Sequence, residues 1–195
     1  MKTHELTLPV DNAQIEKLDI GDTVYLSGIV CTARDMGHLE MKQLIEQKKP
    51  LPIDLHGMAI FHAGPVCVKD DSGKWTLRVI GPTTSIRMEP HADWVGKDLG
   101  AKLIIGKGGM AQGSLDAFKQ YKQAYLQAVP GCAVLLSEGV KSVKDVFWLE
   151  NGMPEAMWVL NVEHFGPFIV TMDCKGNSRY EDVKSKARKV LETAY

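Results

Sequence analysis

Short apolar runs rich in valine and isoleucine recur along the chain, and most are bounded by glycine or proline. Such runs predict β-strands, because a strand needs only a few residues and ends where the chain turns. We expect strands at 23–30, 58–63, 76–80, 102–105, 133–136, 156–162 and 168–172.

Segments with apolar residues at helical spacing lie between these runs. Residues three or four positions apart share one face of a helix, and this pattern covers 37–47, 88–100, 114–128 and 181–193. Interleaved strands and helices predict an α/β fold with a mixed sheet and flanking helices. Because no repeat or low-complexity linker divides the 195 residues, we expect one domain over 1–195, with 181–195 as a helical tail.

The segment 101–138 has the pattern of a strand, a glycine-rich loop, a long helix and a second strand. Such a crossover normally joins two parallel neighbours of a sheet in the right-handed sense. The strands predicted before and after this unit lack helices between them. They indicate an added antiparallel or barrel-like layer.

Composition narrows the classes of function. With 23 basic and 24 acidic residues, the formal charge of −1 gives no long-range attraction to nucleic acid or to anionic membranes. The pattern shows neither a signal peptide nor a membrane-spanning run, so we expect a cytoplasmic protein. The cysteines form no CxxC pair and no Cys/His cluster, which predicts reduced structural thiols and no metal ligands; they are Cys31, Cys67, Cys132 and Cys174.

The first candidate loop follows the predicted strand 76–80 and leads into a predicted helix. Its hydroxyls, which include Thr83 and Thr84, would lie where free backbone N–H groups and the helix dipole favour an anion. Arg87, one turn beyond Thr83, could bind the same anion with both ends of its guanidinium. Alternatively, a threonine merely caps the helix and Arg87 is a solvated charge.

The second candidate loop begins at Gly106. Its glycines would let a ligand approach the backbone, and Lys107 supplies a mobile positive charge. The spacing Gly106-x-Gly108-x-x-Ala111 also fits a dinucleotide-binding loop, with Glu138 at the end of the next predicted strand as the acid that binds ribose. A dinucleotide-binding oxidoreductase domain is therefore an alternative.

Two further side chains follow predicted strands. Arg34 lies beside a predicted helix start that Asp35 would cap, and it could either pair with Asp35 or bind a ligand. His62 ends another strand, where a single histidine is more often a packed or solvated residue than a catalyst. Three cations and a hydroxyl-rich turn at strand ends describe half an active site for a dianionic substrate.

Taken together, these motifs resemble the β subunit of two-subunit class I hydro-lyases, the family of tartrate dehydratase and iron-sulfur fumarase. The resemblance covers nearly the whole chain. The ordered motifs that carry it are Thr32-Ala33-Arg34-Asp35, His62-Ala63-Gly64-Pro65, Gly81-Pro82-Thr83-Thr84-Ser85-Ile86-Arg87-Met88, Gly106-Lys107-Gly108-Gly109, Gly152-Met153-Pro154-Glu155 and Lys175-Gly176-Asn177.

The resemblance implies a swivelling β/β/α domain that docks on an α subunit, and this α subunit carries a four-iron four-sulfur cluster on three cysteines. Two α and two β subunits would form a heterotetramer. In such enzymes the open iron acts as a Lewis acid on the leaving hydroxyl, while a base removes a proton from the neighbouring carbon. The substrate is a four-carbon dicarboxylate such as tartrate, malate or fumarate.

The resemblance also implies roles for individual residues: Thr83 is the candidate base, and Arg34, Arg87 and Lys107 form the candidate carboxylate clamp. A threonine hydroxyl needs strongly positive surroundings, or a relay to an acid of the partner, to accept a proton. Many class I fumarases carry Ala-Gly where this chain has Ser85-Ile86, which is similar to tartrate dehydratases and to some two-subunit fumarases, so the substrate stays open. A non-catalytic assembly module is the other alternative.

Overall fold

Five strands close into a barrel in the computed structural model, which describes residues 1–194 and the side chains of residues 1–193. They are β2 (Thr23–Thr32), β3 (Ala59–Phe61), β6 (Leu103–Gly106), β7 (Ala124–Ala128) and β9 (Met157–Met172). Tyr195, the last residue of the predicted tail, lies outside the described residues.

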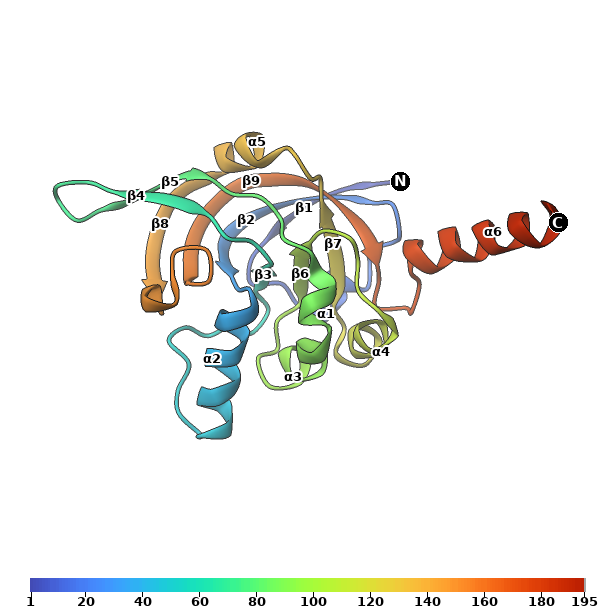
Figure 1. The fold of residues 1–195 in the computed structure, drawn as a ribbon, viewed down its shortest axis with the longest axis horizontal. Helices are drawn as coiled ribbons and strands as arrows, with labels where there is room; N and C mark the ends of the chain where they lie inside the picture. The colour runs from blue at the N-terminus through green and yellow to red at the C-terminus, as the bar shows by residue number, and fades with distance from the viewer. Residues whose placement is uncertain (195) are drawn as a thin grey trace.

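The first four strands of the barrel are parallel neighbours in the order β2, β3, β6 and β7. Strand β9 is antiparallel to both β7 and β2 and so closes the ring. Two more strands extend the sheet: β1 (Thr3–Thr7) pairs with β2, and β8 (Val140–Phe147) pairs with β9. Strands β4 (Val66–Lys69) and β5 (Trp75–Val79) form a separate hairpin that projects from the body (Figure 1).

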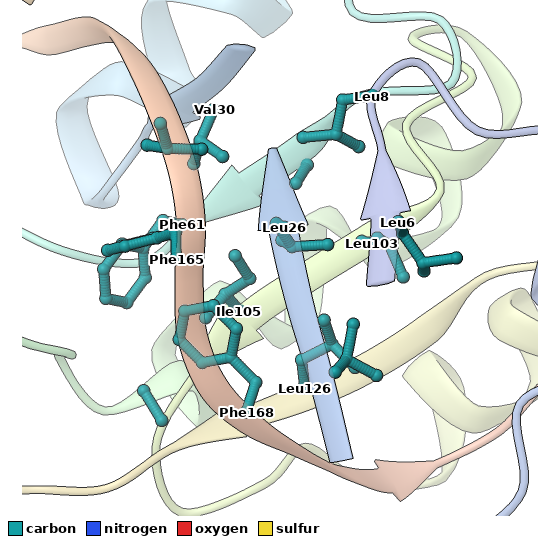
Figure 2. Packing of buried hydrophobic residues seen from close by; sticks show 14 of the residues in the cluster. Leu6, Leu8, Leu26, Val30, Phe61, Leu103, Ile105, Leu126, Phe165 and Phe168 are labelled. Carbon is teal, nitrogen blue, oxygen red and sulfur yellow. The ribbon is translucent and has the colours of Figure 1, made fainter. Parts of the chain in front are cut away.

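The barrel strands alternate between two apolar cores, because successive side chains of a strand point to opposite faces. Phe61, Ile105 and Leu126 belong to the interior core, where they gather with Val30, Leu26 and the two phenylalanines of β9 (Figure 2). Their neighbours Ile60, Ile104 and Tyr125 belong to the second core. That core lies between the barrel and three helices, which are α2 (Asp35–Glu46), α3 (Ala92–Lys97) and α4 (Gln112–Tyr121).

The remaining helices are short or peripheral. They are α1 (Asn12–Ile15), α5 (Ala133–Glu138), α6 (Arg179–Ala194) and the 3₁₀ helices η1 (Ser85–His91) and η2 (Leu149–Asn151). Figure 1 shows α6 extending away from the barrel, and residues 181–193 are all exposed. No helix among the described residues is long and apolar enough to cross a membrane.

The predicted α/β fold with a mixed sheet and flanking helices is confirmed, but several predicted elements were wrong. The run 133–136 is helical, in α5, and the predicted helix 114–128 ends at Tyr121 and is followed by β7. The parallel crossover from β6 therefore leads to β7. The two strands predicted at 156–162 and 168–172 are one strand, β9, and the prediction missed β1, β4 and β8.

Candidate functional site

The candidate side chains follow parallel strands of the barrel. Because β2, β3 and β6 are parallel, their carboxyl ends lie at one edge. Arg34 comes just after β2, His62 just after β3 and Lys107 just after β6. Ligands of parallel sheets commonly bind at such an edge.

The turn that contains Thr83 crosses this edge and is held by backbone hydrogen bonds on both sides. The Thr83 N–H donates to the carbonyl of His62 at 2.7 Å, and the Lys107 N–H donates to the carbonyl of Thr83 at 3.2 Å. The Ser85 N–H returns a bond to the carbonyl of Lys107 at 3.0 Å. The hydroxyl-rich turn is thus fixed between the ends of β3 and β6.

Arg87 contacts the side chain of Thr83 directly. Its Nη2 lies 3.2 Å from Thr83 Oγ1 and 2.9 Å from a carboxylate oxygen of Asp35. A positive donor on a hydroxyl oxygen favours the deprotonated form of that hydroxyl. Thr84, which directly precedes η1, makes no side-chain cap bond, and the helix expected after this turn begins as a 3₁₀ helix.

Arg34 is paired with Glu155, so its suggested pairing with Asp35 was wrong. Arg34 Nη2 lies 3.0 Å from Glu155 Oε1, and both side chains are less than a quarter exposed. The other Glu155 oxygen accepts the backbone N–H of Met36 at 3.1 Å. Asp35 is not available to Arg34 because it pairs with Arg87.

Lys107 differs from the two arginines in its partners. Its backbone is bridged to Thr84, and its side chain is partly exposed. Within the described part of the chain, its ammonium takes part in none of the ion pairs that fix the neighbouring arginines. Lys107 is therefore the cation of this edge whose charge is most available to a ligand.

A buried hydroxyl, that of Ser85, anchors the turn to the barrel. The Tyr125 hydroxyl donates to Ser85 Oγ at 2.9 Å, and Ser85 Oγ is hydrogen-bonded to His62 Nδ1 at 2.9 Å. A Cβ atom at Gly106 would lie 1.8 Å from Ser85 Oγ. The absence of a side chain at Gly106 therefore makes room for Ser85, and this glycine does not open the backbone to a ligand.

Three histidine rings lie behind the turn. His38 donates from Nδ1 to the carbonyl of Arg34 at 2.8 Å, and its ring centroid is 5.4 Å from that of His62 and 5.0 Å from that of His91. Burial lowers the pKa of His38 to about 4 and that of His62 well below its usual value. At neutral pH both buried rings are uncharged and act as hydrogen-bonding and packing groups.

The N-terminus of α4, which follows the Gly106 loop and would have to receive the phosphates of a dinucleotide, is occupied by the chain itself. Glu89 accepts the backbone N–H groups of Ala111 at 2.8 Å and Ser114 at 2.9 Å, which are the free donors at the start of α4. Glu138 lies in α5 and not at the end of a strand. The expected position of Glu138 is therefore contradicted, and Glu89 already occupies the N–H groups that a dinucleotide would use.

Sequence reasoning expected cations just after strands, which is where Arg34 and Lys107 lie, but it did not pair Glu155 with Arg34 or Asp35 with Arg87. Glu155 is distant from Arg34 in sequence, and only the pairing of β2 with β9 brings the two segments together. The signal that could have found Glu155 is its motif, Gly152-Met153-Pro154-Glu155, because an acid after a turn at a strand start is well placed to pair with an arginine.

Comparison with known proteins decides the family. The family model described as Fumarase C-terminus matches residues 2–183. The chain belongs to this family. The resemblance inferred from the sequence motifs is confirmed.

Proteins similar to this chain include both separate subunits and a longer protein. The chain is 42% identical over 173 residues to the L(+)-tartrate dehydratase subunit beta of Escherichia coli, which covers 89% of this chain and 84% of the relative. It is 44% identical over 178 residues to a Methanocaldococcus jannaschii protein named "Putative L(+)-tartrate dehydratase subunit beta", with 91% of each chain covered. A Geobacillus stearothermophilus protein named "Putative fumarate hydratase class I" is 41% identical over 95% of this chain, but the match covers only 35% of that longer protein.

Proposed function

We propose that this chain is the β subunit of a hydro-lyase that adds or removes water at a four-carbon dicarboxylate, either L-tartrate or malate and fumarate. The family and the names of its relatives support this reaction class. The observation that carries the proposal is the arrangement of Arg34, Thr83, Arg87 and Lys107 at one barrel edge, with the guanidinium of Arg87 on the Thr83 hydroxyl.

In this proposal the three cations bind and orient the two carboxylates of the substrate. Guanidinium groups suit carboxylates because they can donate two parallel hydrogen bonds, and the ammonium of Lys107 adds a mobile charge. Thr83 accepts the proton from the carbon next to the leaving hydroxyl, either directly or through a relay. The adjacent Arg87 favours this role because it stabilises negative charge on the threonine oxygen.

The iron-sulfur cluster implied by the family belongs, in this proposal, to a partner α subunit. No group of three or more His, Cys, Asp or Glu side chains among the described residues could hold a metal. Of the four cysteines, three are buried, and burial raises the pKa of Cys31 to about 12, which disfavours the thiolate that iron requires. When bound to the partner, the cluster would supply a Lewis acid for the leaving hydroxyl.

The same proposal includes the assembly and the architecture that the family implies. This chain, as one swivelling β/β/α domain over 1–195, would cover an iron-sulfur α subunit in a heterotetramer of two α and two β chains. The match to 35% of a longer relative supports a partner, because most of that relative has no counterpart in the match to this chain.

Turnover by the separate and the combined subunits tests the proposal. The chain would be produced without oxygen, alone and together with its iron-sulfur α subunit, and assayed with L-tartrate, fumarate and malate. We expect dehydration or hydration of one of these substrates only when both chains are present. Robust turnover by this chain alone, or an assembled complex with full cluster content that acts on none of the three, would contradict it and favour a non-catalytic module.

A further inference from the structure

We infer that Glu155 and Asp35 are positioning residues, which hold Arg34 and Arg87 in the orientations that the reaction needs. The inference rests on the proposed function for the reaction itself, but not for the contacts. The two ion pairs lie on adjacent residues of one segment, since Arg34 pairs with Glu155 and Asp35 pairs with Arg87.

Glu155 holds both the side chain of Arg34 and the start of α2. One carboxylate oxygen lies 3.0 Å from Arg34 Nη2, and the other accepts the N–H of Met36 at 3.1 Å. The Arg34 guanidinium is confined from the other side as well, because a Cβ atom at Gly64 would lie 2.9 Å from its Nη1. The Nε of Arg34 is buried and has no hydrogen-bond partner among the described residues. Glu155 is therefore the carboxylate that fixes this guanidinium.

Asp35 fixes Arg87 in a different way. The same Arg87 nitrogen, Nη2, lies 2.9 Å from Asp35 Oδ2 and 3.2 Å from Thr83 Oγ1. Both charged side chains are more than 40% exposed, so this pair alone adds little stability. The pair instead fixes the orientation of Arg87, because the Asp35 carboxylate keeps Nη2 against the hydroxyl of Thr83, the candidate base.

The two carboxylates should therefore differ in their kinetic effects. Arg34 contacts a substrate carboxylate in the ground state and in the transition state alike, so misplacing it should raise KM and leave kcat nearly unchanged. Arg87 touches the atom on which charge develops, so misplacing it should lower kcat. Neutral Gln and Asn variants keep the shape of each side chain and remove only its charge.

The contacts can be tested on the full chain by nitrogen-15 NMR of arginine side chains, independently of activity. The Arg34 Nε–H signal is assigned as the one that disappears in Arg34→Lys. Because the Arg34 Nε is buried, its proton should exchange with water at least about ten times more slowly than the Nε–H proton of the exposed Arg188. Glu155→Ala should bring it close to the rate of Arg188, and Glu155→Gln should give an intermediate rate. Glu150→Gln, at an exposed acid before the same turn, is the matched control and should change nothing.

The kinetic test uses the assembled complex with its iron-sulfur partner, with cluster content matched between variants. We expect Glu155→Gln to raise the KM for the dicarboxylate by about fivefold at nearly constant kcat, and Asp35→Asn to lower kcat by about tenfold. Glu155→Ala should raise KM more than Glu155→Gln, and Glu150→Gln should match the wild type.

Two results would overturn the inference. One is an Arg34 Nε–H that exchanges as fast as that of Arg188 in the wild-type chain, or that is unaffected by Glu155→Ala. The other is a lower KM in either neutral variant, which would mean that the carboxylates compete with substrate. An inactive wild-type complex would instead refute the proposed function, while the NMR result would still decide whether Glu155 holds Arg34.

Discussion

At the scale of single residues, the three cations of the candidate site differ in whether they form ion pairs within the chain. Arg34 and Arg87 each have a carboxylate partner 3.0 Å or less away. Lys107 takes part in none of the ion pairs formed within the described residues, and it is held only through its backbone and the loop around it. Its charge should therefore contribute directly to binding of an anionic ligand.

Replacing Lys107 by alanine should weaken dicarboxylate binding without preventing assembly. In the complex with the iron-sulfur subunit we expect the KM to rise by about tenfold, because a charge-assisted contact to a carboxylate is lost. The matched control is Lys97→Ala, at an exposed lysine of α3. Equal KM values for the two variants would remove Lys107 from the site.

Protonation of the buried histidines should make stability depend on pH. The pKa of His38 is about 4 in the folded chain, below the value of about 6.5 of an unfolded histidine. Between these values the unfolded chain binds a proton that the folded chain does not. The free energy of unfolding should therefore fall as pH decreases from about 6.5 to about 4, by up to about 1.4 kcal/mol per pH unit for each such group.

His38→Gln should reduce this slope relative to the wild-type chain, by up to the contribution of one bound proton. Urea unfolding at a series of pH values between 4 and 7 measures the difference. Identical slopes in the wild-type chain and in His38→Gln would show that His38 is not buried in its neutral form.

At the scale of elements, Gly106 at the end of β6 contacts Ser85 at the start of η1. This contact joins the loop that carries Lys107 to the turn that carries Thr83. Ser85 is fully buried and takes part in two side-chain hydrogen bonds. A methyl group at Gly106 would occupy the space of the Ser85 hydroxyl. The two positions should therefore be energetically coupled.

Gly106→Ala should destabilise the chain by about 1–3 kcal/mol through overpacking. Ser85→Ala should cost a similar amount, about 1–3 kcal/mol, because it removes the hydroxyl that His62 and Tyr125 share. The double variant should lose less than the sum, since the alanine methyl fills the vacated space. Urea unfolding of the four proteins measures the coupling, and strictly additive losses would contradict it.

Much of this element order could be predicted from sequence, and the failures have physical reasons. The apolar run 133–136 has the composition of a short strand, but two of its side chains, Val134 and Leu135, are exposed on a helix. The boundary between α4 and β7 was missed because Lys122, and not a glycine, adopts the left-handed conformation that ends the helix. Propensity alone does not reveal such an ending.

The placement of the candidate side chains after strands was more predictable than these boundaries. Arg34, His62 and Lys107 each follow a strand, and parallel pairing brings such positions to one edge. Which carboxylate pairs with which arginine could not be predicted, because it depends on the closure of the barrel by β9. The hydrogen bonds from the start of α4 to Glu89 could not be predicted for the same reason, because they join residues that are 22 or more positions apart.

At the scale of the whole molecule, α6 is separable from the barrel. The family match ends at residue 183, and residues 181–193 are exposed. Tyr180 differs, because its ring lies where a Cβ atom at Gly109 would be and its hydroxyl is 3.1 Å from Thr171 Oγ1. The start of α6 is therefore part of the folded body, and the rest is an appendage.

A chain that ends at Asp182 should keep a melting temperature within about 2 °C of the full chain, because little packed surface is lost. A chain that ends at Ser178 should melt lower by several degrees, about 4 °C or more, since it loses Tyr180. Thermal unfolding followed by circular dichroism distinguishes them. A large loss in the longer of the two truncated chains would show that α6 supports the barrel.

In the proposed function the whole molecule supplies one half of a reaction site, and the central contact of that proposal is the one between Arg87 and the hydroxyl of Thr83. The most direct measurement is turnover by the assembled complex carrying Thr83→Val, compared with Thr84→Val at the adjacent exposed threonine. Both variants remove one hydroxyl and keep the branched shape. We predict that Thr83→Val lowers kcat by at least about a hundredfold, as expected for loss of the base, while Thr84→Val stays within about threefold of the wild type. Equal activity of the two complexes would contradict the assignment of this edge as the site of reaction.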